Sequence, residues 1–353
     1  MGKREAPVPM LRVDAFLLTY PPQRFIGAEL ATHALLRALS DRGHQVTVHV
    51  VDGVDRPYGF DGLSVVPFRG LPDSADVLVT HPYISPHLME PVDRHPAPTV
   101  MMAHSTWAHI RKAVSERPLD LLVSNSLATH RLLSAEVSST VRHVVVRPPL
   151  RYKPDRAFLA EQLLSPKSHR VAGYVNGIRA KGGEIIDDVI AHAYPRWDFV
   201  GVRGGWTDQN SKDLVLSNVD RFSYDRQFHP SEMIDRYYSR ISMHLQPSLT
   251  ESWGMSALEA LANGVPVVAS DLPGIREALR PFGPDWVRYV DVDGPPWVTS
   301  GNVIDLMDDL VEVRPCGRSA VDEIEAIVSD IRVMSANDRS TCALTIEDVV
   351  NSS

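Results

Sequence analysis

The sequence is poor in cysteine: its 353 residues include only two, Cys316 and Cys342, both near the end. Two cysteines do not build a disulfide framework, and their scarcity fits a reducing cytosol. Neither an H-E-x-x-H nor a Cys-x-x-Cys motif occurs, so we expect no metal site. A G-x-G-x-x-G motif after the first apolar run is also missing, which argues against a dinucleotide-dependent oxidoreductase.

Long apolar runs are missing as well. No run approaches the ~18 residues of a membrane span, and the first ten residues, MGKREAPVPM, lack the apolar core of a signal peptide. The formal net charge is −8, so no overall positive field favours nucleic acid or an anionic membrane. We therefore expect a cytoplasmic protein with no transmembrane segment and no nucleic-acid partner.

The residues that are present indicate an α/β protein with a parallel sheet. The hydrophobic fraction of 44% and the charged fraction of 23% are typical of globular chains, and the length suffices for two domains. LRVDAFLLTY (11–20) and HQVTVHVV (44–51) read as strands, and AELATHALLRALSDRG (28–43) between them has the spacing of a helix. Strand, helix and strand within about forty residues form a βαβ unit, which implies parallel pairing.

Three further apolar runs in the first half each end in a polar residue. The residues concerned are His81, His104, and Asn125 with Ser126. In an open parallel sheet, ligands bind outside the carboxyl ends of the strands. We expect His104 to lie at a strand end that faces the ligand, where its ring can form hydrogen bonds, and the alternative is a structural histidine whose hydrogen bonds are satisfied within the protein. His81 is either structural or lines the acceptor site, and Asn125 and Ser126 are expected to cap the next helix.

A second α/β half follows a charged, proline-rich connection over residues 141–154. The predicted organisation is a first domain over residues 1–150, a second over residues 151–320, and a helical segment over residues 321–353. The sequence leaves open whether that last segment closes the second domain or crosses back to the first.

The stretch TESWGMSALEALANGVPVVASDLPG (250–274) places two carboxylates eight positions apart, on Glu251 and Glu259. We expect a strand to end before it and a helix to begin near Gly254 or Met255, with Glu259 about 7–8 Å further along the axis. The unpaired amides of the helix start (Trp253, Gly254, Met255 and Ser256) and the positive end of its dipole suit a diphosphate. Glu251 can then reach a sugar hydroxyl, and Glu259 can accept from a ribose diol.

Simpler interpretations stay open for the two glutamates and for Lys181 in the segment IRAKGG (178–183). Glu251 can be a solvated acid of a loop, and Glu259 can be a surface residue of an amphipathic helix. Lys181 can be a solvated lysine in a glycine-rich turn. The segment YVDVDG (289–294) contains an Asp-x-Asp pair, but it comes after the stretch with Glu251 and Glu259 and not directly after the first α/β half, so we interpret it as the end of an edge strand rather than a metal site.

The segment SLTESWGMSALEALANGVPVVASDLPGIREAL (248–279) resembles the E-x7-E region of retaining, nucleotide-sugar-dependent glycosyltransferases of the GT-B fold, most nearly glycosyltransferase family four. Three more segments resemble that family in order. They are IGAELATHALLRALSDRGHQVTV (26–48), TVMMAHSTW (99–107) and VNGIRAKGG (175–183). The resemblance implies two Rossmann-like domains facing across a cleft, the first binding the acceptor and the second the nucleotide sugar.

The resemblance also implies roles for particular residues. Glu251 would contact the donor sugar near its reacting face, and Glu259 the ribose. Lys181 and Arg179 would neutralise the diphosphate, while His104 would act on the acceptor side. Further donor-binding positions are implied at Gly27, Asn176, Trp253, Gly254, Met255 and Ser256.

The implied reaction moves a hexose-type sugar from a nucleotide diphosphate sugar to a hydroxyl group, with retention and with neither metal nor further cofactor. The acceptor is expected to be a small molecule or a glycan, and peripheral membrane contact is left open. A sugar-nucleotide epimerase, a phosphorylase and an inactive sugar-nucleotide-binding protein on the same fold are the alternatives.

The sequence departs from the family pattern at four positions. Ile26 stands for the first of two glycines, and either Asn176 or Val175 lies where an arginine is usual. Trp253 replaces a common phenylalanine, and Pro273 precedes Gly274 where a second glycine is common. These departures bear on the identity of the donor more than on the class of reaction.

Overall fold

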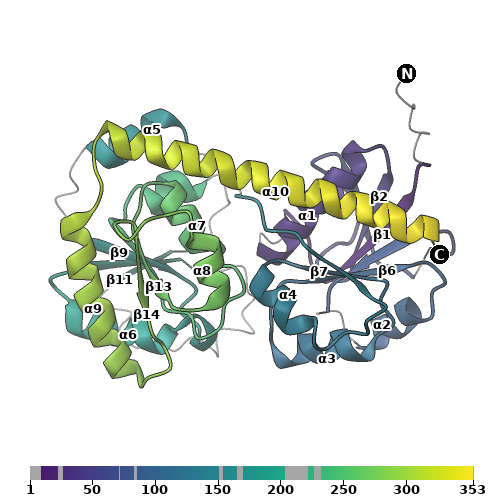
Figure 1. Ribbon diagram of the computed structural model, residues 1–353, viewed down its shortest axis with the longest axis horizontal. Coiled ribbons are helices and arrows are strands. Elements are labelled where there is room, and N and C mark those ends of the chain that lie inside the picture. Colours follow the sequence, from purple (N-terminus) through teal and green to yellow (C-terminus); the bar gives the residue numbers. More distant parts are fainter. Residues whose placement is uncertain are drawn as a thin grey trace. The chain divides into compact units, whose positions relative to one another are not determined.

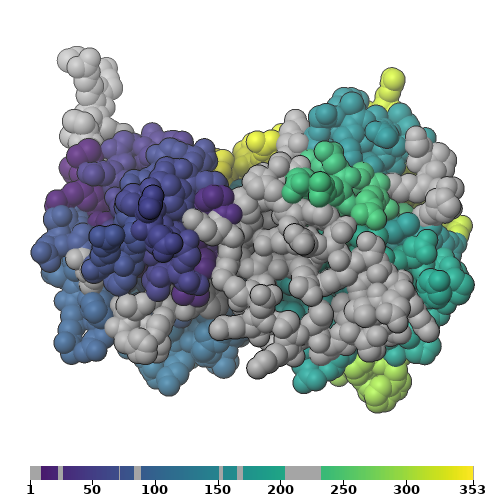
Figure 2. Space-filling view, turned by 180° about the vertical axis from the view of Figure 1, so that it is seen from behind, coloured from purple at the N-terminus to yellow at the C-terminus, as the bar shows by residue number. Residues whose placement is uncertain are grey.

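The computed structural model describes residues 9–22, 27–70, 72–82, 86–150, 154–164, 170–202, 222–225 and 232–352, and other residues are drawn in grey (Figures 1 and 2). The chain divides into two compact units. Unit 1 comprises Met1–Pro149 and Met334–Ser353, and unit 2 comprises Leu150–Val333. Each unit contains a sheet with helices packed on its faces.

The sheet of unit 1 has the order β3-β4-β2-β1-β5-β6-β7-β8 in the described residues. Its pairings are parallel except that of β3 with β4, as the βαβ pattern predicts for the core of the sheet. The strands are β1 (Arg12–Leu17), β2 (Gln45–Val50), β3 (Tyr58–Phe60), β4 (Leu63–Pro67), β5 (Val77–Thr80), β6 (Thr99–Ala103), β7 (Leu121–Ser124) and β8 (Arg142–Val145).

Helices cover both faces of this sheet, because successive side chains of a buried parallel strand point to opposite sides. Val13 of β1 belongs to the same core as Leu35 of α1 (Gly27–Asp41). Phe16 points to the other face and packs near Met89 of α2 (Pro86–Asp93). The remaining helices of that face are α3 (Ala108–Glu116) and α4 (Leu127–Leu133).

The sheet of unit 2 is parallel in every described pairing and has the order β11-β10-β9-β12-β13-β14. Its strands are β9 (Val171–Val175), β10 (Asp198–Val202), β11 (Phe222–Asp225), β12 (Met243–Gln246), β13 (Val267–Ser270) and β14 (Val287–Val290). Figure 1 shows the helices of this unit on both sides of the sheet: α5 (Arg156–Leu164), α6 (Gly183–Ala193), α7 (Met255–Ala262), α8 (Pro273–Leu279) and α9 (Pro296–Val313).

The last helix, α10 (Arg318–Ser352), contributes to the cores of both units. Ile324 and Val328 belong to the core of unit 2, whereas Cys342 and Ile346 belong to that of unit 1. In unit 1, Glu347 accepts from the Arg42 guanidinium at 2.6 Å and lies 2.8 Å from the His44 ring nitrogen. Residues 321–352 of the predicted C-terminal segment thus belong to one helix that contributes to two cores. No helix in the described ranges is long and apolar enough to span a membrane.

Candidate functional site

The candidate site of unit 2 lies where the strand order reverses. From β9 the chain proceeds to β10 and β11 on one side, and it then returns to β12 on the other side of β9. The carboxyl ends of β9 and β12 are therefore neighbours whose following loops diverge. Such a switch point is the ligand-binding place of open α/β sheets.

Direct backbone contact joins the two loops that leave β9 and β12. Leu249 N donates to the carbonyl oxygen of Ala180 at 3.1 Å. Gly182 has a φ of +76°, and a Cβ built on it would lie 1.9 Å from the carbonyl oxygen of Pro247. Only glycine fits this backbone conformation and this approach, so the glycine-rich turn places the preceding lysine against the loop after β12.

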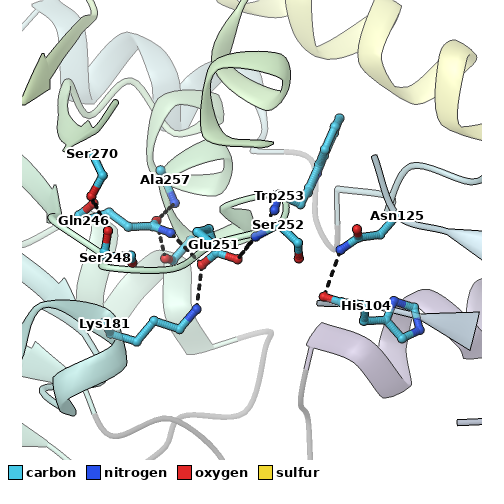
Figure 3. Close-up of polar contacts among 11 residues, drawn as sticks. His104, Asn125, Lys181, Gln246, Ser248, Glu251, Ser252, Trp253, Ala257 and Ser270 are labelled. Atoms are coloured by element: carbon cyan, nitrogen blue, oxygen red, sulfur yellow. Dashed lines mark hydrogen bonds and ion pairs between the residues drawn. The ribbon is translucent and has the colours of Figure 1, made fainter. Parts of the chain in front are cut away.

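Lys181 and Glu251, 70 positions apart in sequence, form an ion pair with Nζ and Oε2 separated by 2.5 Å (Figure 3). The Lys181 side chain is 29% exposed and that of Glu251 is 13% exposed. Glu251 is therefore a partly enclosed carboxylate rather than a solvated loop acid, and Lys181 is paired rather than free in solvent.

Glu251 is supplied with hydrogen-bond donors on both oxygens. Oε1 accepts from the backbone N–H groups of Ser252 at 3.0 Å and Trp253 at 3.5 Å. Oε2 accepts from Lys181 and from Gln246 Nε2, the latter at 3.0 Å. Burial alone would raise the pKa of Glu251, but the Lys181 charge and these hydrogen bonds outweigh it and hold the pKa below the ordinary 4.5.

The depressed pKa predicts a pH-dependent contribution to stability. A carboxyl whose pKa is lower in the folded state stabilises that state above its unfolded pKa, and the contribution is lost as the pH falls through the folded value. We expect wild type to be more stable than Glu251→Gln at pH 7, and we expect the difference in their free energies of unfolding to decrease below about pH 4.5. Urea midpoints of both proteins between pH 7 and pH 3.5 measure this difference. A difference that does not change with pH would contradict the prediction.

Helix α7 begins beside this carboxylate. Gly254 is its N-cap residue with a φ of +80°, and Gln246 Oε1 accepts from Ala257 N at 2.9 Å. The amides of Met255 and Ser256 belong to the first turn and have no intrahelical acceptor. The start of α7 therefore combines amides, the positive end of a helix dipole and the nearby Lys181, which is the arrangement an anion requires.

Two expected site residues point into the interior of unit 2. Glu259 is 1% exposed, and its Oε2 accepts from the Tyr238 hydroxyl at 3.2 Å, so it is not a surface residue. Trp253 is 2% exposed and belongs to the hydrophobic core, and Figure 3 shows its ring directed away from the Glu251 carboxylate. Only the backbone of Trp253 lies at the candidate site, through its N–H on Glu251.

Arg179 and Asn176 lie in the loop after β9. Arg179 is 70% exposed and pairs with Glu184 at 2.6 Å, on the first turn of α6. Asn176 has a φ of +67°, and its N–H donates to the carbonyl oxygen of Val202 at 2.9 Å. A left-handed asparagine turns the chain directly after β9, so both residues border the switch point.

The candidate residues of unit 1 gather at the ends of β5 and β6. Thr32 Oγ1 of α1 lies 2.6 Å from His81 Nε2 and 3.0 Å from His104 Nε2. Burial lowers the pKa of His104 to about 4, so its ring is neutral at pH 7 and acts through hydrogen bonds. The neighbouring His81 also has a lowered pKa, first because it is buried and second because of His104.

The expected helix cap is confirmed for one of the two residues. Ser126 is the N-cap of α4, and its side chain accepts from Thr129 N at 3.0 Å. Asn125 instead donates from Nδ2 to the carbonyl oxygen of His104 at 3.1 Å. Gly27 opens α1, and Ile26 lies outside the described residues.

A hollow of about 470 Å³ lies between α1 and α10 in unit 1. Arg37 on its wall donates to the carbonyl oxygen of Asp61 and to the Asp41 carboxylate. Arg42, also on the wall, is bound to Glu347. Because these cations are bound internally, the hollow is a weaker candidate than the switch point of unit 2.

The Asp-x-Asp segment lies at an edge of the unit 2 sheet. Asp291 follows β14, the last strand in the order, and accepts from Asp293 N at 2.9 Å. Within the described ranges, no three carboxylate, histidine or cysteine side chains gather in a way that could hold a metal ion.

Sequence reasoning missed Gln246 and Thr32. Gln246 ends β12 and contacts both Glu251 and α7, and Thr32 contacts both histidines. A signal for Gln246 was present, because a polar residue at the end of the apolar run RISMHLQ fits the rule that singled out His104. Thr32 lies within a helix of the first βαβ unit, where its sequence position carries no such signal.

Part of this chain is similar in sequence to known glycosyltransferases. Residues 226–288 match the family Glycosyl transferases group 1. A D-inositol 3-phosphate glycosyltransferase of Corynebacterium urealyticum is 30% identical over 129 residues, which cover 32% of this chain and 30% of that protein. The match thus spans about a third of the curated relative.

Solved structures extend the likeness to nearly the whole chain. Sucrose-phosphate synthase from Thermosynechococcus elongatus has a TM-score of 0.68 at 16% identity, covering 92% of this chain and 96% of that one. Anabaena Alr3699/HepE in complex with UDP and glucose has a TM-score of 0.65 at 16% identity, covering 97% and 98%. The expected fold class is confirmed: the chain has the GT-B fold with two Rossmann-like units, and its second unit carries a glycosyl transferases group 1 segment.

Proposed function

We propose that this protein is a retaining glycosyltransferase of family four, which moves a hexose-type sugar from a nucleotide diphosphate sugar to a hydroxyl acceptor without a metal ion. One observation carries the proposal: at the switch point of unit 2, Lys181 and Glu251 meet beside the start of α7. The similar HepE protein, crystallised with UDP and glucose, supports a nucleotide-sugar donor.

Lys181 is the cation for the leaving group in this proposal. Departure of a nucleoside diphosphate leaves negative charge on its phosphate, and preorganised cations and amides stabilise that charge as it develops. In the structure Lys181 neutralises Glu251 instead. Binding of the donor therefore exchanges one partner for another: the ammonium turns from the carboxylate to the diphosphate.

This exchange also prepares Glu251 for the sugar. Four donors contact its carboxylate. Two are backbone amides and the third is the buried Gln246 side chain. Lys181 is the fourth, and its partly exposed side chain can rotate most easily. Once it leaves, Oε2 gains a lone pair for a sugar hydroxyl, so phosphate binding and sugar binding are coupled.

The proposal also assigns roles to other residues. Glu259 is assigned to the ribose diol, and because its side chain is 1% exposed and bonded to the Tyr238 hydroxyl, this role requires that the carboxylate becomes accessible when the donor binds. Met255 and Ser256 supply first-turn amides to the diphosphate. In unit 1, the neutral His104 bonds the acceptor or the transferred sugar, and Gly27 at the start of α1 allows close approach of the backbone.

A panel of UDP-, GDP-, dTDP- and ADP-sugars in thermal-shift assays tests the donor site, with the matching nucleoside monophosphates as controls that lack the diphosphate. One diphosphate series is expected to raise the melting temperature, since a ligand at 100 times its Kd adds about 2.7 kcal/mol to stability. The best donor is then incubated with acceptor pools, and product anomers are identified by NMR.

Each outcome has a distinct meaning. Transfer with retained configuration in the presence of EDTA supports the proposal. Conversion of the donor alone into an epimer would indicate an epimerase, and donor binding with no turnover on any acceptor would indicate a binding protein. If no donor shifts the melting temperature, the nucleotide-sugar site assigned to unit 2 is wrong.

A further inference from the structure

Gln246 lies between the Lys181–Glu251 pair and the first turn of α7. It is the last residue of β12 and is 6% exposed. Its Nε2 donates to Glu251 Oε2 at 3.0 Å, while its Oε1 accepts from Ala257 N at 2.9 Å and from Ser256 Oγ at 2.8 Å (Figure 3). Both ends of the side-chain amide are thus occupied.

The chemistry of its neighbours fixes which end of the amide faces which partner. A backbone N–H can only donate, and an ionised carboxylate can only accept. The amide oxygen must therefore face Ala257, and the amide nitrogen must face Glu251. A glutamate in this place would bring two carboxylates together, and a leucine would leave the buried N–H of Ala257 without its acceptor.

We propose that Gln246 is a positioning residue for sugar transfer, which holds Glu251 against the start of α7 while Lys181 engages the diphosphate. The inference rests on the proposed function and deepens it. Of the two donors on Oε2, Lys181 leaves when the donor binds, whereas Gln246 is buried and held at both ends. After the exchange, Gln246 and two backbone amides keep the carboxylate in place.

The contact between Gln246 and α7 uses one amide of the first turn and leaves the others for the ligand. Gln246 uses the amide of Ala257, the third residue of α7. The amides nearer the N-cap, those of Met255 and Ser256, are left for the diphosphate. Because Gln246 itself does not take a phosphate contact, its loss is expected to lower kcat and to leave the KM for the donor nearly unchanged.

The first experiment compares Gln246→Leu and Gln246→Glu with wild type across pH 5.5 to 8. Gln246→Leu is expected to lower kcat at least tenfold at every pH, with the donor KM within about threefold. In Gln246→Glu the introduced carboxyl has a raised pKa beside Glu251, and its protonated form can donate as the amide does. Its kcat relative to wild type is therefore expected to rise as the pH falls.

Gln162→Glu is the matched control. Gln162 is a buried glutamine of α5 in the same unit, with 5% of its surface exposed. Its kcat ratio to wild type is expected to stay near one over the whole range. A wild-type kcat in Gln246→Leu, or a rise in the donor KM larger than the fall in kcat, would overturn the positioning role.

A second measurement does not depend on activity, so it distinguishes failure of the proposed function from failure of the inference about Gln246. Urea denaturation of Gln246→Glu, Glu251→Gln and the double variant forms a cycle. Because Glu251→Gln removes the repulsion and supplies an amide donor, the destabilisation by Gln246→Glu at pH 7 is expected to be smaller in that background. The loss from Gln162→Glu should be the same in both backgrounds. Additive losses for Gln246→Glu would overturn the inference even if transfer is observed, and coupling without any transfer in wild type would reject only the proposed function.

Discussion

Replacing Lys181 by alanine is expected to lower the rate of sugar transfer at least a hundredfold without unfolding the protein. A hundredfold loss corresponds to about 3 kcal/mol of transition-state stabilisation, the size measured when one preorganised charge or donor is removed from a reacting centre. Lys181 is the cation that meets Glu251 beside the start of α7, and in the proposed function its loss removes charge stabilisation from the diphosphate. Glu251→Gln is expected to have an effect of similar size, because the neutral amide no longer accepts on both atoms.

A control variant and melting temperatures test whether the loss of transfer is specific to Lys181 and Glu251. Lys112→Ala removes an exposed lysine from α3 in the other unit, where it pairs with Glu116 at 3.9 Å, and is expected to leave transfer unchanged. Melting temperatures of all variants separate lost chemistry from lost folding. Wild-type rates for both Lys181→Ala and Glu251→Gln would refute the roles assigned to this pair.

Gly182→Ala is expected to abolish transfer and to destabilise the protein by more than the usual cost of a left-handed alanine, about 1–2 kcal/mol. Its Cβ would lie 1.9 Å from the carbonyl oxygen of Pro247, where no backbone atom can yield without moving the loop after β12. Displacement of that loop separates Lys181 from Glu251. Urea denaturation and transfer assays measure the two effects.

Gly317→Ala is the control for the cost of placing an alanine in the left-handed backbone conformation. Gly317 has a φ of +90° in the same unit, and no heavy atom lies within 4 Å of a Cβ built there. This variant is expected to lose only about 1–2 kcal/mol of stability, the cost of a left-handed alanine, and to transfer sugar at the wild-type rate. Equal losses in both variants would show that the contact with Pro247 does not matter.

The fold could be predicted from the sequence because local patterns determine much of it. Alternating and continuous apolar runs identify β1, β2 and β12, and a parallel sheet follows from a helix between consecutive strands. The polar ends of β5 and β6 also indicated where His81 and His104 lie. These inferences need only neighbouring residues and the handedness of the chain.

The contacts of the candidate site could not be predicted in the same way. Lys181 and Glu251 meet because β9 and β12 are neighbours, and that strand order is a property of the whole sheet. The sequence suggested that Lys181 neutralises a phosphate, and the structure shows its carboxylate partner. The donors on Glu251 depend on loop conformation, which the left-handed Gly254 and the buried Gln246 define together.

The long final helix has a consequence for how the gene can be divided. Because residues 334–353 complete the core of unit 1 while residues 150–333 form unit 2, no single cut yields two self-sufficient fragments. A fragment ending near residue 149 would lack Cys342, Ala343 and Ile346 from its interior and expose the apolar surface they cover. Chimeras that exchange unit 2 between proteins of this fold therefore require two crossover points, and the second must fall within a continuous helix.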